Sequence, residues 1–510
     1  MVTQETELKL AATPRTLDRL AADPLLGAQR GGAQRLVAVY FDTPRFTLWR
    51  RGLSLRLRRE RGRWVQGVKG GGTVEAGLHR RTEIEHPATG PVPDLALIRD
   101  HPLGKLVARA AGARPLVPAF RVEVARTTRS VSPAPGVTIE VSLDRGTIHA
   151  GMARAPIGEI ELELKTGPAW RLFEFALALA RRHALRVEER SKAARGYELA
   201  GAVRAAPVRA RLGVIRREMS SSGAFRAVSW MCLNHLQANY RGASRGADPE
   251  YVHQARVALR RLRSGMGAFA KLFPAEVVEP QAKLVREMAG TLGPAREWDV
   301  FAEQTLAPVM QQFPGHRGLA ALERACARLR LAANRTAQRA LASRRYQLLV
   351  LGLGAWLGEE PWLAAASGKA RRAWELPVRD HAVAVLDRYY RRLLKRGRGS
   401  HRLSLRRLHR LRIAAKKLRY AAGFFAPLFS RKRSKPMLDA LNELQDVLGA
   451  ISDCAAAPAL IDAATAAARG PLRQQARMIV SHWNAAMLED RRRELKQVWR
   501  TIRGCGRFWR

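Results

Sequence analysis

Apolar and charged side chains alternate along short stretches of the first 200 residues. In residues 5–9, an extended chain places Glu5, Glu7 and Lys9 on one face and Thr6 and Leu8 on the other. The same alternation recurs at residues 53–58, 64–69, 79–85, 120–130, 137–144 and 159–165. Clusters of Gly and Pro separate several of these stretches. The pattern predicts antiparallel strands joined by turns.

The face opposite the apolar side chains of these strands carries both carboxylates and cations. This predicts a closed β-barrel whose outer face packs on helices and whose lumen is charged. Carboxylates gathered in a lumen need a divalent cation, and Mg²⁺ binds one or two carboxylates together with phosphate oxygens of a substrate. Opposing Arg and Lys side chains would bind those phosphates, which implies metal-assisted attack of water on a phosphoanhydride. An exposed antiparallel sheet with cross-strand salt bridges is the alternative.

The pattern becomes helical in the second part of the chain. From residue 225 onward, segments rich in Ala, Leu and Arg are separated by Gly and Pro. Their lengths predict an all-α bundle of about eight or more helices. A passage rich in Ser, Gly and Arg before them predicts a linker. The expected organisation is α+β, with a barrel domain over residues 1–202, a linker over 203–224 and a helical domain over 225–510.

One helical segment occurs twice, at residues 252–263 and 408–419, with an offset of 156 residues. Each copy places one His and three cations at positions i, i+3, i+7 and i+10, which share one stripe of a helix. Cations on one stripe repel one another, so the duplicated pattern points to an anion as the counter-charge. The alternative is a solvated basic face. The stripes comprise His253, Arg256, Arg260 and Arg263 in the first copy, and His409, Arg412, Lys416 and Arg419 in the second.

The composition strengthens the expectation of an anionic partner. The formal net charge is +46, which predicts binding to nucleic acid, an anionic membrane or polyphosphate. Residues 1–200 contain 33 basic and 21 acidic residues, and the remaining 310 contain 57 and 23. The duplicated helical part therefore carries most of the positive charge.

Other features narrow the class of protein. The four cysteines are far apart without metal-ligand spacing, which predicts free thiols rather than a disulfide framework or zinc site. The N-terminal segment has no secretory signal pattern, and no run of about 18 apolar residues predicts a membrane span. The sequence therefore predicts a cytoplasmic protein.

The first 200 residues resemble the CYTH family, the triphosphate tunnel metalloenzymes, and within it the bacterial inorganic triphosphatases. The resemblance rests on Glu5-x-Glu7-x-Lys9 at the N-terminus and on further motifs that follow in order. These include Tyr40-Phe-Asp-Thr-Pro44, Leu55-Arg-Leu-Arg58, Gly77-Leu-His-Arg-Arg81, Leu143-Asp-Arg-Gly146, Glu159-x-Glu-x-Glu163 and Ser191-Lys-Ala-Ala-Arg-Gly-Tyr197.

The CYTH resemblance implies an eight-stranded antiparallel tunnel that uses Mg²⁺ or Mn²⁺. The implied metal ligands are Glu5, Glu7, Glu159, Glu161, Glu163 and Asp144, although the sequence does not tell which pair of the three later glutamates binds metal. The implied triphosphate ligands are Lys9, Arg56, Arg58, Lys69, Arg81, Arg126 and Lys192. Glu140 is, like Asp144, a further contributor to the site. Glu5, Glu7 and Lys9 are the implied catalytic residues.

Residues 225–460 resemble the CHAD family, an α-helical domain with conserved histidines that is linked to inorganic polyphosphate. The resemblance rests on the two repeated segments and on the stretches 292–300 and 444–453. It implies that the two basic stripes are facing walls of one polyphosphate groove, with Arg261, Arg296 and Lys417 as outer contacts. Glu297 and Asp453, at matching positions of the two copies, would orient the arginines together with Asp299.

Three functional hypotheses follow. The first is a metal-dependent inorganic triphosphatase that also binds polyphosphate, with thiamine triphosphatase and adenylate cyclase activity as minor alternatives. The second is a non-catalytic protein of cytoplasmic polyphosphate granules. The third is a nucleic-acid binder, which rests on charge alone, because aromatic content is only 6% and no nucleic-acid motif occurs.

Overall fold

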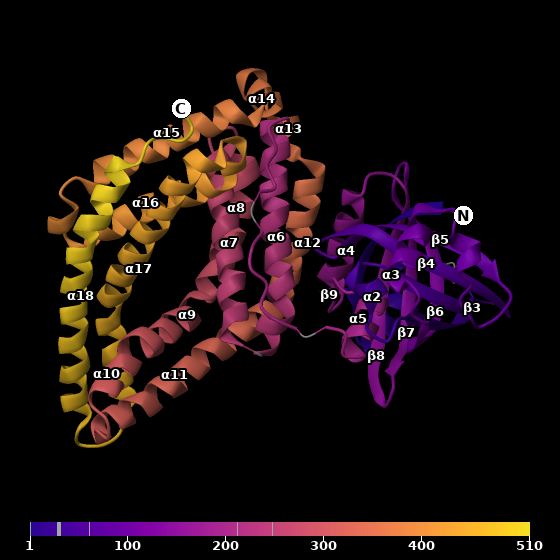
Figure 1. Ribbon diagram of the computed structural model, residues 1–510, viewed down its shortest axis with the longest axis horizontal. Helices are drawn as coiled ribbons and strands as arrows, with labels where there is room; N and C mark the ends of the chain where they lie inside the picture. Colours follow the sequence, from indigo (N-terminus) through magenta and orange to yellow (C-terminus); the bar gives the residue numbers. More distant parts are fainter. Residues whose placement is uncertain (1, 28–31, 61, 204, 212, 247) are drawn as a thin grey trace. The chain divides into compact units, whose positions relative to one another are not determined.

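The computed structural model describes residues 2–27, 32–60, 62–203, 205–211, 213–246 and 248–510 (Figure 1). Two compact units make up the chain. The first comprises Met1–Ala206 and Ser343–Glu359, and the second comprises Pro207–Ala342 and Glu360–Arg510.

The first unit is built on a closed antiparallel barrel. Its strands are β1 (Val2–Ala11), β2 (Ala33–Asp42), β3 (Ser54–Glu60), β4 (Arg63–Glu75), β5 (Leu78–Ala88), β6 (Val117–Ala134), β7 (Val137–Ala150) and β8 (Ala153–Thr166). They follow the order β5-β4-β3-β2-β6-β7-β8-β1, and pairing of β1 with β5 closes the ring. A two-residue strand, β9 (Arg186–Val187), also pairs with β1. The predicted eight-stranded tunnel is confirmed, and the alternative of an open, exposed sheet is wrong.

The alternation in the sequence sorts side chains between the two faces of the barrel. Leu8 and Leu10 of β1 are fully buried on the outer face, where helix α4 (Trp170–Arg182) packs. The charged residues that alternate with them, Glu7 and Lys9, lie on the opposite, inward face and are also buried. The remaining helical segments of this part are α1 (Pro14–Ala21), η1 (Pro24–Leu26), α2 (Thr47–Arg50), η2 (Leu95–Ile98), α3 (Pro102–Ala111) and α5 (Lys192–Leu199).

Helix α12 (Arg344–Glu359) belongs to the first unit although it lies far along the chain. It packs on α4 so closely that a Cβ at Gly354 would lie 2.4 Å from the ring of Phe173. The Gln347 side-chain oxygen also accepts a hydrogen bond from the backbone N–H of Val187, at 2.9 Å. The division of the chain expected from the sequence, with everything after residue 225 in one domain, takes no account of this helix.

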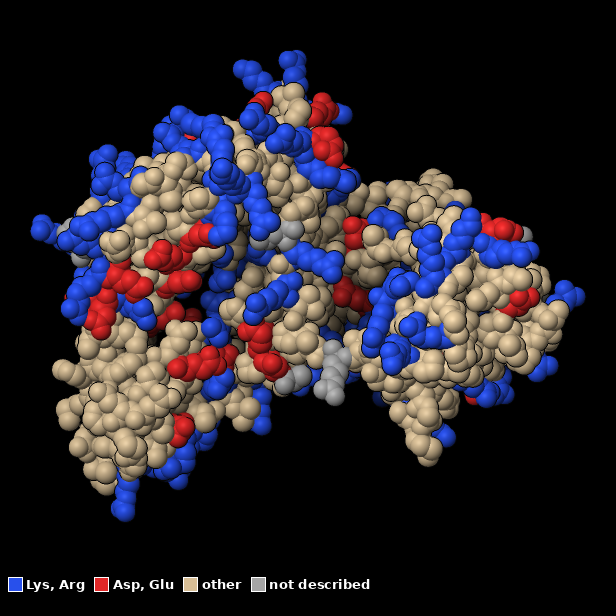
Figure 2. Space-filling view, in the orientation of Figure 1, with Lys and Arg blue, Asp and Glu red and all other residues tan. Residues whose placement is uncertain are grey.

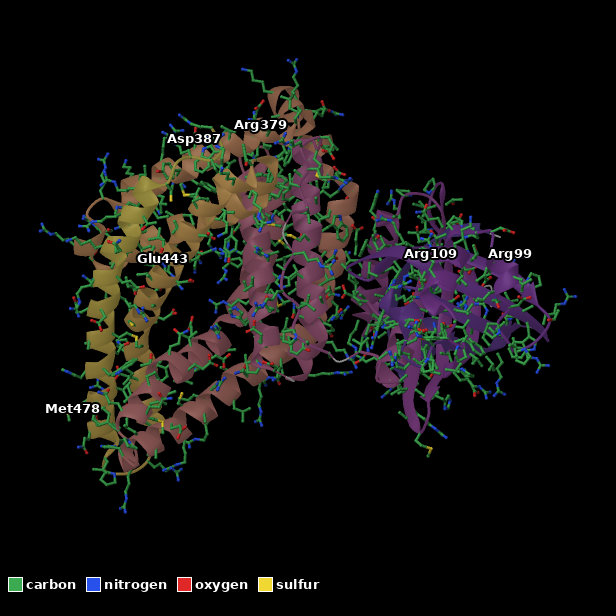
Figure 3. All side chains as sticks on the ribbon, viewed as in Figure 1. Arg99, Arg109, Arg379, Asp387, Glu443 and Met478 are labelled. Atoms are coloured by element: carbon green, nitrogen blue, oxygen red, sulfur yellow. The ribbon has the colours of Figure 1, made fainter. Side chains whose placement is uncertain are left out.

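The second unit is all helical. Its elements are α6 (Ser221–Arg245), α7 (Pro249–Phe269), α8 (Ala275–Thr291), α9 (Gly293–Val300), the π-helix η3 (Phe301–Leu306), α10 (Ala307–Gln312), α11 (Arg317–Ala342), α13 (Pro361–Ala365), α14 (Gly368–Glu375), α15 (Val378–Gly397), η4 (Ser400–Arg402), α16 (Leu405–Phe425), η5 (Ala426–Leu428), α17 (Arg431–Ala467) and α18 (Arg473–Gly504). The repeated segments lie on α7 and α16, which contact each other. The C-terminal residues fold back on α15, where Asp387 accepts a hydrogen bond from Trp509 Nε1 at 2.9 Å (Figure 3).

Among the described residues, one helix is long and apolar enough in composition to be compatible with a membrane span, namely α17. The sequence alone predicts no membrane span. In the structure, α17 packs against α16, α18 and α11, and its residues Leu441 and Leu444 are fully buried. Length and composition of a single helix are weak evidence for a span.

Candidate active site and anion-binding groove

The barrel encloses a cavity of about 370 Å³. The predicted residues that line it are Glu5, Glu7, Arg56, Arg58, Lys69, Arg81, Arg126, Glu140, Glu161, Glu163 and Lys192. Two lining carboxylates, Glu83 and Glu85, received no role from the sequence, although they continue the alternation of β5. The described lining contains six cations and seven carboxylates, so the cavity holds both signs of charge in nearly equal number.

Ion pairs fix the cations on the β3–β5 side of the cavity. The Arg56 guanidinium lies 2.9 Å from Glu83 and 3.0 Å from Glu85, and Lys69 Nζ lies 2.6 Å from Glu5. Burial alone would lower the pKa of Arg56. The interactions with Tyr40 and Glu83 raise it by more, so the pKa of Arg56 lies above its ordinary value. These cations are therefore permanently charged and held in place before any ligand arrives.

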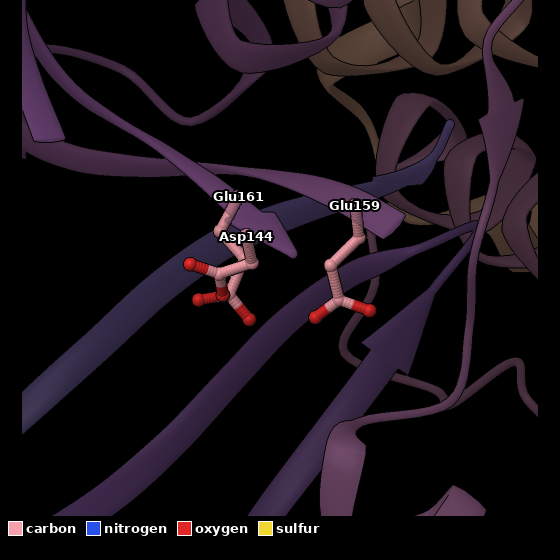
Figure 4. A group of neighbouring side chains, drawn as sticks. All are labelled: Asp144, Glu159 and Glu161. Atoms are coloured by element: carbon pink, nitrogen blue, oxygen red, sulfur yellow. The ribbon is translucent and has the colours of Figure 1, made fainter. Parts of the chain in front are cut away.

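Three buried carboxylates form a cluster at the other side of the tunnel. Oxygen atoms of Asp144, Glu159 and Glu161 all lie within 4.8 Å of one another (Figure 4). Strand register brings them together, because Asp144 of β7 pairs with Glu159 of β8, and Glu161 lies two residues farther on the same face. Carboxylate oxygens are the ligands that Mg²⁺ and Mn²⁺ prefer, so the donor set fits either ion.

Cations surround this acid cluster. Lys192 Nζ, from the first residue of α5, lies 2.6 Å from Asp144, 2.5 Å from Glu159 and 3.0 Å from Glu161. Arg126 donates two hydrogen bonds to Asp144, at 2.8 and 2.6 Å. Burial alone would raise the pKa of the Glu161 carboxyl. The charges of Lys192 and then Lys9 lower it by more, so the pKa of Glu161 lies well below its usual range. All three acids therefore have cationic neighbours.

The other predicted metal ligands lie outside the cluster and have partners of their own. Glu7 accepts a hydrogen bond from Lys9 at 2.7 Å, and Glu163 accepts one from Lys165, also at 2.7 Å. Lys9 also binds Glu161 and is only 4% exposed, so its ammonium lies between two carboxylates that line the cavity, although Lys9 is not among the described residues of the lining itself. Of the three later glutamates, the structure groups Glu159 and Glu161 with Asp144.

His79 is a tunnel residue to which sequence reasoning gave no role. It is 1% exposed and pairs across the strands with Glu7. Neither ring nitrogen has a hydrogen-bond partner among the described residues. Burial, and secondly the charge of Lys9, lower its pKa to about 3, so the ring is neutral at pH 7. The sequence does indicate that His79 faces the tunnel, because residues 79 and 81 of β5 lie on the same face of the strand and Arg81 points inward.

The second unit contains a larger cavity, a groove of about 900 Å³. Both repeated helices line it, with His253, Arg256 and Arg260 from α7 and His409, Arg412 and Lys416 from α16. The two stripes thus meet at one groove, as the resemblance to the CHAD family implies. Arg296, expected as an outer contact, also lines it. Arg263 and Arg419, the last cation of each stripe, are not among the described residues of the lining.

Hydrogen bonds fix several of the groove's arginines. Arg256 donates to the backbone oxygen of Gly293 at 2.9 Å, and Arg412 donates to Ser452 at 2.8 Å. Arg260 donates from Nε to the hydroxyl of Tyr420 at 2.5 Å, which links α7 to α16. These contacts leave other N–H groups of the same guanidinium groups for a ligand.

Positive charge is concentrated in this groove and near it. Burial, and then the charges of Arg412 and Arg260, lower the pKa of Lys416 to about 7. Burial, and then Arg296, lower the pKa of His253. Lys and Arg side chains are also dense over the end of the second unit that contains α14, α15 and α16 (Figure 2). The groove therefore has an excess of positive charge that an anion would relieve.

Comparison with known proteins agrees with this division of sites. A family model described as the CYTH domain matches residues 3–197, and one described as the CHAD domain matches residues 227–462. The inorganic triphosphatase of Haemophilus influenzae is 34% identical over 202 residues, which cover 38% of this chain and 55% of that protein. The chain thus spans about half the length of this curated relative.

A solved structure resembles the helical part. The crystal structure of the CHAD domain from the plant Ricinus communis is 28% identical, with a TM-score of 0.51, and the match covers 59% of this chain and 98% of that one. The tunnel and the groove accordingly fall within two recognised domains. Residues 3–197 thus form a CYTH domain, and residues 227–462 form a CHAD domain.

Proposed function

We propose that this protein is a divalent-metal-dependent inorganic triphosphatase whose helical unit binds inorganic polyphosphate. The observation that supports the first part is the mixed charge of the tunnel, with six cations and seven carboxylates in its described lining. Seven carboxylates would repel a free triphosphate, so a polyanion is expected to enter together with divalent cations. The 34% identity to an inorganic triphosphatase supports the same activity.

The acidic and basic residues of the tunnel would have different roles. Asp144, Glu159 and Glu161 would coordinate the metal, which when bound neutralises charge on phosphate oxygens and lowers the pKa of coordinated water. Arg56 and Lys69 would bind and orient the phosphates. Because carboxylates already fix these two cations, phosphate binding requires little rearrangement of the protein.

Phosphate release from tripolyphosphate, with Mg²⁺ and with Mn²⁺, tests the activity. Arg58 faces the cavity, whereas the next residue of β3, Arg59, is exposed on the outer face. Arg58→Gln should lower kcat/KM at least about tenfold, the scale of one lost charge-assisted contact. Arg59→Gln removes the same charge one residue away and should leave kcat/KM unchanged. Equal effects of both variants, or no turnover with either metal, would contradict the proposal.

Polyphosphate binding is proposed on the basis of the groove in the second unit. Six cationic or imidazole side chains from two repeats converge there, which suits a polymer of identical anionic units. Arg412→Gln should weaken binding of long-chain polyphosphate by the full chain. Arg410→Gln, on the same helix but exposed and outside the described lining, is the matched control.

RNA is the competitor that tests the identity of this polymer. If the groove recognises phosphate spacing rather than bulk charge, polyphosphate should displace RNA at the same concentration of phosphate groups, over a range of salt. Equal affinity for both polymers would leave only a non-specific polyanion site. Association with cytoplasmic polyphosphate granules follows from the proposal, and granule binding without turnover would leave a binding protein rather than an enzyme.

A further inference from the structure

We propose that the Lys192 ammonium is a built-in substitute for a divalent cation, which gives up its place in the acid cluster when the metal binds and then contacts the substrate's phosphates. This inference rests on the proposed function, because it concerns the same metal and the same triphosphate. It adds a coupling between the two ligands that passes through one side chain.

The position of Lys192 carries the inference. Its Nζ atom contacts all three carboxylates of the cluster at 2.5–3.0 Å, and the oxygens of those carboxylates lie within 4.8 Å of one another. An ion that binds the same oxygens at the usual distance of about 2.0–2.1 Å for Mg²⁺ would occupy nearly the same point. Because two cations repel strongly in a buried site, the ammonium and the metal exclude each other.

The backbone of Lys192 is fixed, so only its side chain can make this exchange. Helix α5 begins at Lys192, and the Ser191 hydroxyl caps it by accepting a hydrogen bond from Ala194 N at 3.1 Å. A Cβ at Gly196 would lie 2.1 Å from the ring of Phe120, so α5 is packed tightly against β6. The lysine side chain, by contrast, has four rotatable bonds and a compact charge.

The displaced ammonium of Lys192 can move into the cavity of the tunnel. Lys192 already lines the cavity, and its side chain keeps 13% of its surface exposed there. A triphosphate in the cavity would supply acceptor oxygens in place of the carboxylates. Metal binding would then improve triphosphate binding, and by thermodynamic reciprocity triphosphate would improve metal binding by the same factor.

Mn²⁺ binding to the full chain without substrate, followed by the EPR signal of free Mn²⁺, tests the inference independently of turnover. In Lys192→Met the competitor is gone, so Mn²⁺ should bind about tenfold more tightly or better, which corresponds to about 1.4 kcal/mol. Arg195→Met is the matched control, because Arg195 contacts Glu159 from one side at 3.2 Å without contacting the other two acids. It removes the same charge but leaves the centre occupied, and should change the affinity less than about threefold.

Two results would overturn the inference. One is that Lys192→Met binds Mn²⁺ no more tightly than the unchanged protein, and the other is that Arg195→Met tightens binding as much. If Lys192→Met does not fold without metal, Mn²⁺ should restore a cooperative melting transition, and failure to do so also overturns it. Hydrolysis by the unchanged protein with an unaltered Mn²⁺ affinity in Lys192→Met would refute the exchange but leave the triphosphatase proposal intact.

A second readout measures the coupling itself. In the unchanged protein, tripolyphosphate should tighten Mn²⁺ binding more than it does in Lys192→Met, because only the unchanged protein has an ammonium to transfer. The same enhancement in both proteins would mean that the metal and phosphate interact directly and that Lys192 takes no part.

Discussion

Polyphosphate binding in the groove should take up protons, and Lys416 should be their main acceptor. The lysine has no ion-pair partner within the described part of the chain. Its pKa lies at about 7 because of burial, then Arg412, Arg260 and Arg256, while only Asp453 opposes them. The other charged or titratable groups of the groove are His253, Arg296, Glu297, His409 and Asp446.

The direction of the pH dependence follows from the fact that the protonated form of Lys416 binds the anion. Phosphate oxygens beside Lys416 favour its charged form and should return its pKa toward the ordinary 10.5. The complex then holds more protons than the free protein between pH 7 and 10.5, so affinity falls as pH rises through that window. With a pKa of about 7, roughly a tenth of the free lysine is neutral at pH 6 and about nine-tenths at pH 8, which weakens binding about tenfold across the interval.

Titration calorimetry in two buffers with different ionisation enthalpies measures this uptake directly. At pH 7, binding should take up about half a proton per site through Lys416. Lys416→Arg retains the positive charge but cannot titrate in this range, so it should lose most of the uptake and of the pH dependence while still binding. Identical proton uptake in Lys416→Arg and in the unchanged protein would show that another group, such as His253, takes up the proton.

Three further perturbations follow from the packing of the two units. Asp144→Asn leaves buried cations without their counter-charge and should lower the free energy of unfolding of the first unit by about 3–5 kcal/mol in urea denaturation, and an unchanged midpoint would contradict the ion-pair geometry. Gly196→Ala forces a Cβ to within 2.1 Å of the Phe120 ring and should destabilise the first unit by about 1–3 kcal/mol, whereas Gly352→Ala on α12 meets nothing within 4 Å and should be neutral or slightly stabilising in the same assay. Tyr420→Phe removes a hydroxyl that accepts a hydrogen bond from α7 and should cost about 1–2 kcal/mol in unfolding of the second unit; retention of full stability would show that the ring alone suffices.

The closed tunnel was predictable because period-2 alternation is a local signal. Each strand shows its charged face independently of the others, and Glu7 and Lys9 do point inward as the alternation requires. The composition of the acid cluster was not predictable in this way. Glu159, Glu161 and Glu163 have the same phase, and only the pairing of β7 with β8 selects the first two as neighbours of Asp144.

The groove shows the same division between local and long-range information. Helical spacing predicted the basic stripes, and the resemblance to the CHAD family implied that both would serve one site. Neither gave the length of that site. Arg263 lies ten residues beyond His253, which is about 15 Å along the helix axis, and the described lining of the groove ends before it. How far a helical stripe stays in contact with a cavity depends on the helices that pack across it.

The membership of α12 in the first unit has a consequence for how the chain is made. The ribosome must synthesise the 136 residues between Ala206 and Ser343 before this last segment of the first unit begins to appear. At about 5–20 residues per second, the nascent barrel waits on the order of ten seconds with the α4 surface around Phe173 uncovered. During that interval the helices of the second unit are emerging, so the barrel is completed only after much of its neighbour has been translated. A gene divided at residue 206 would therefore produce a tunnel that never receives its last helix.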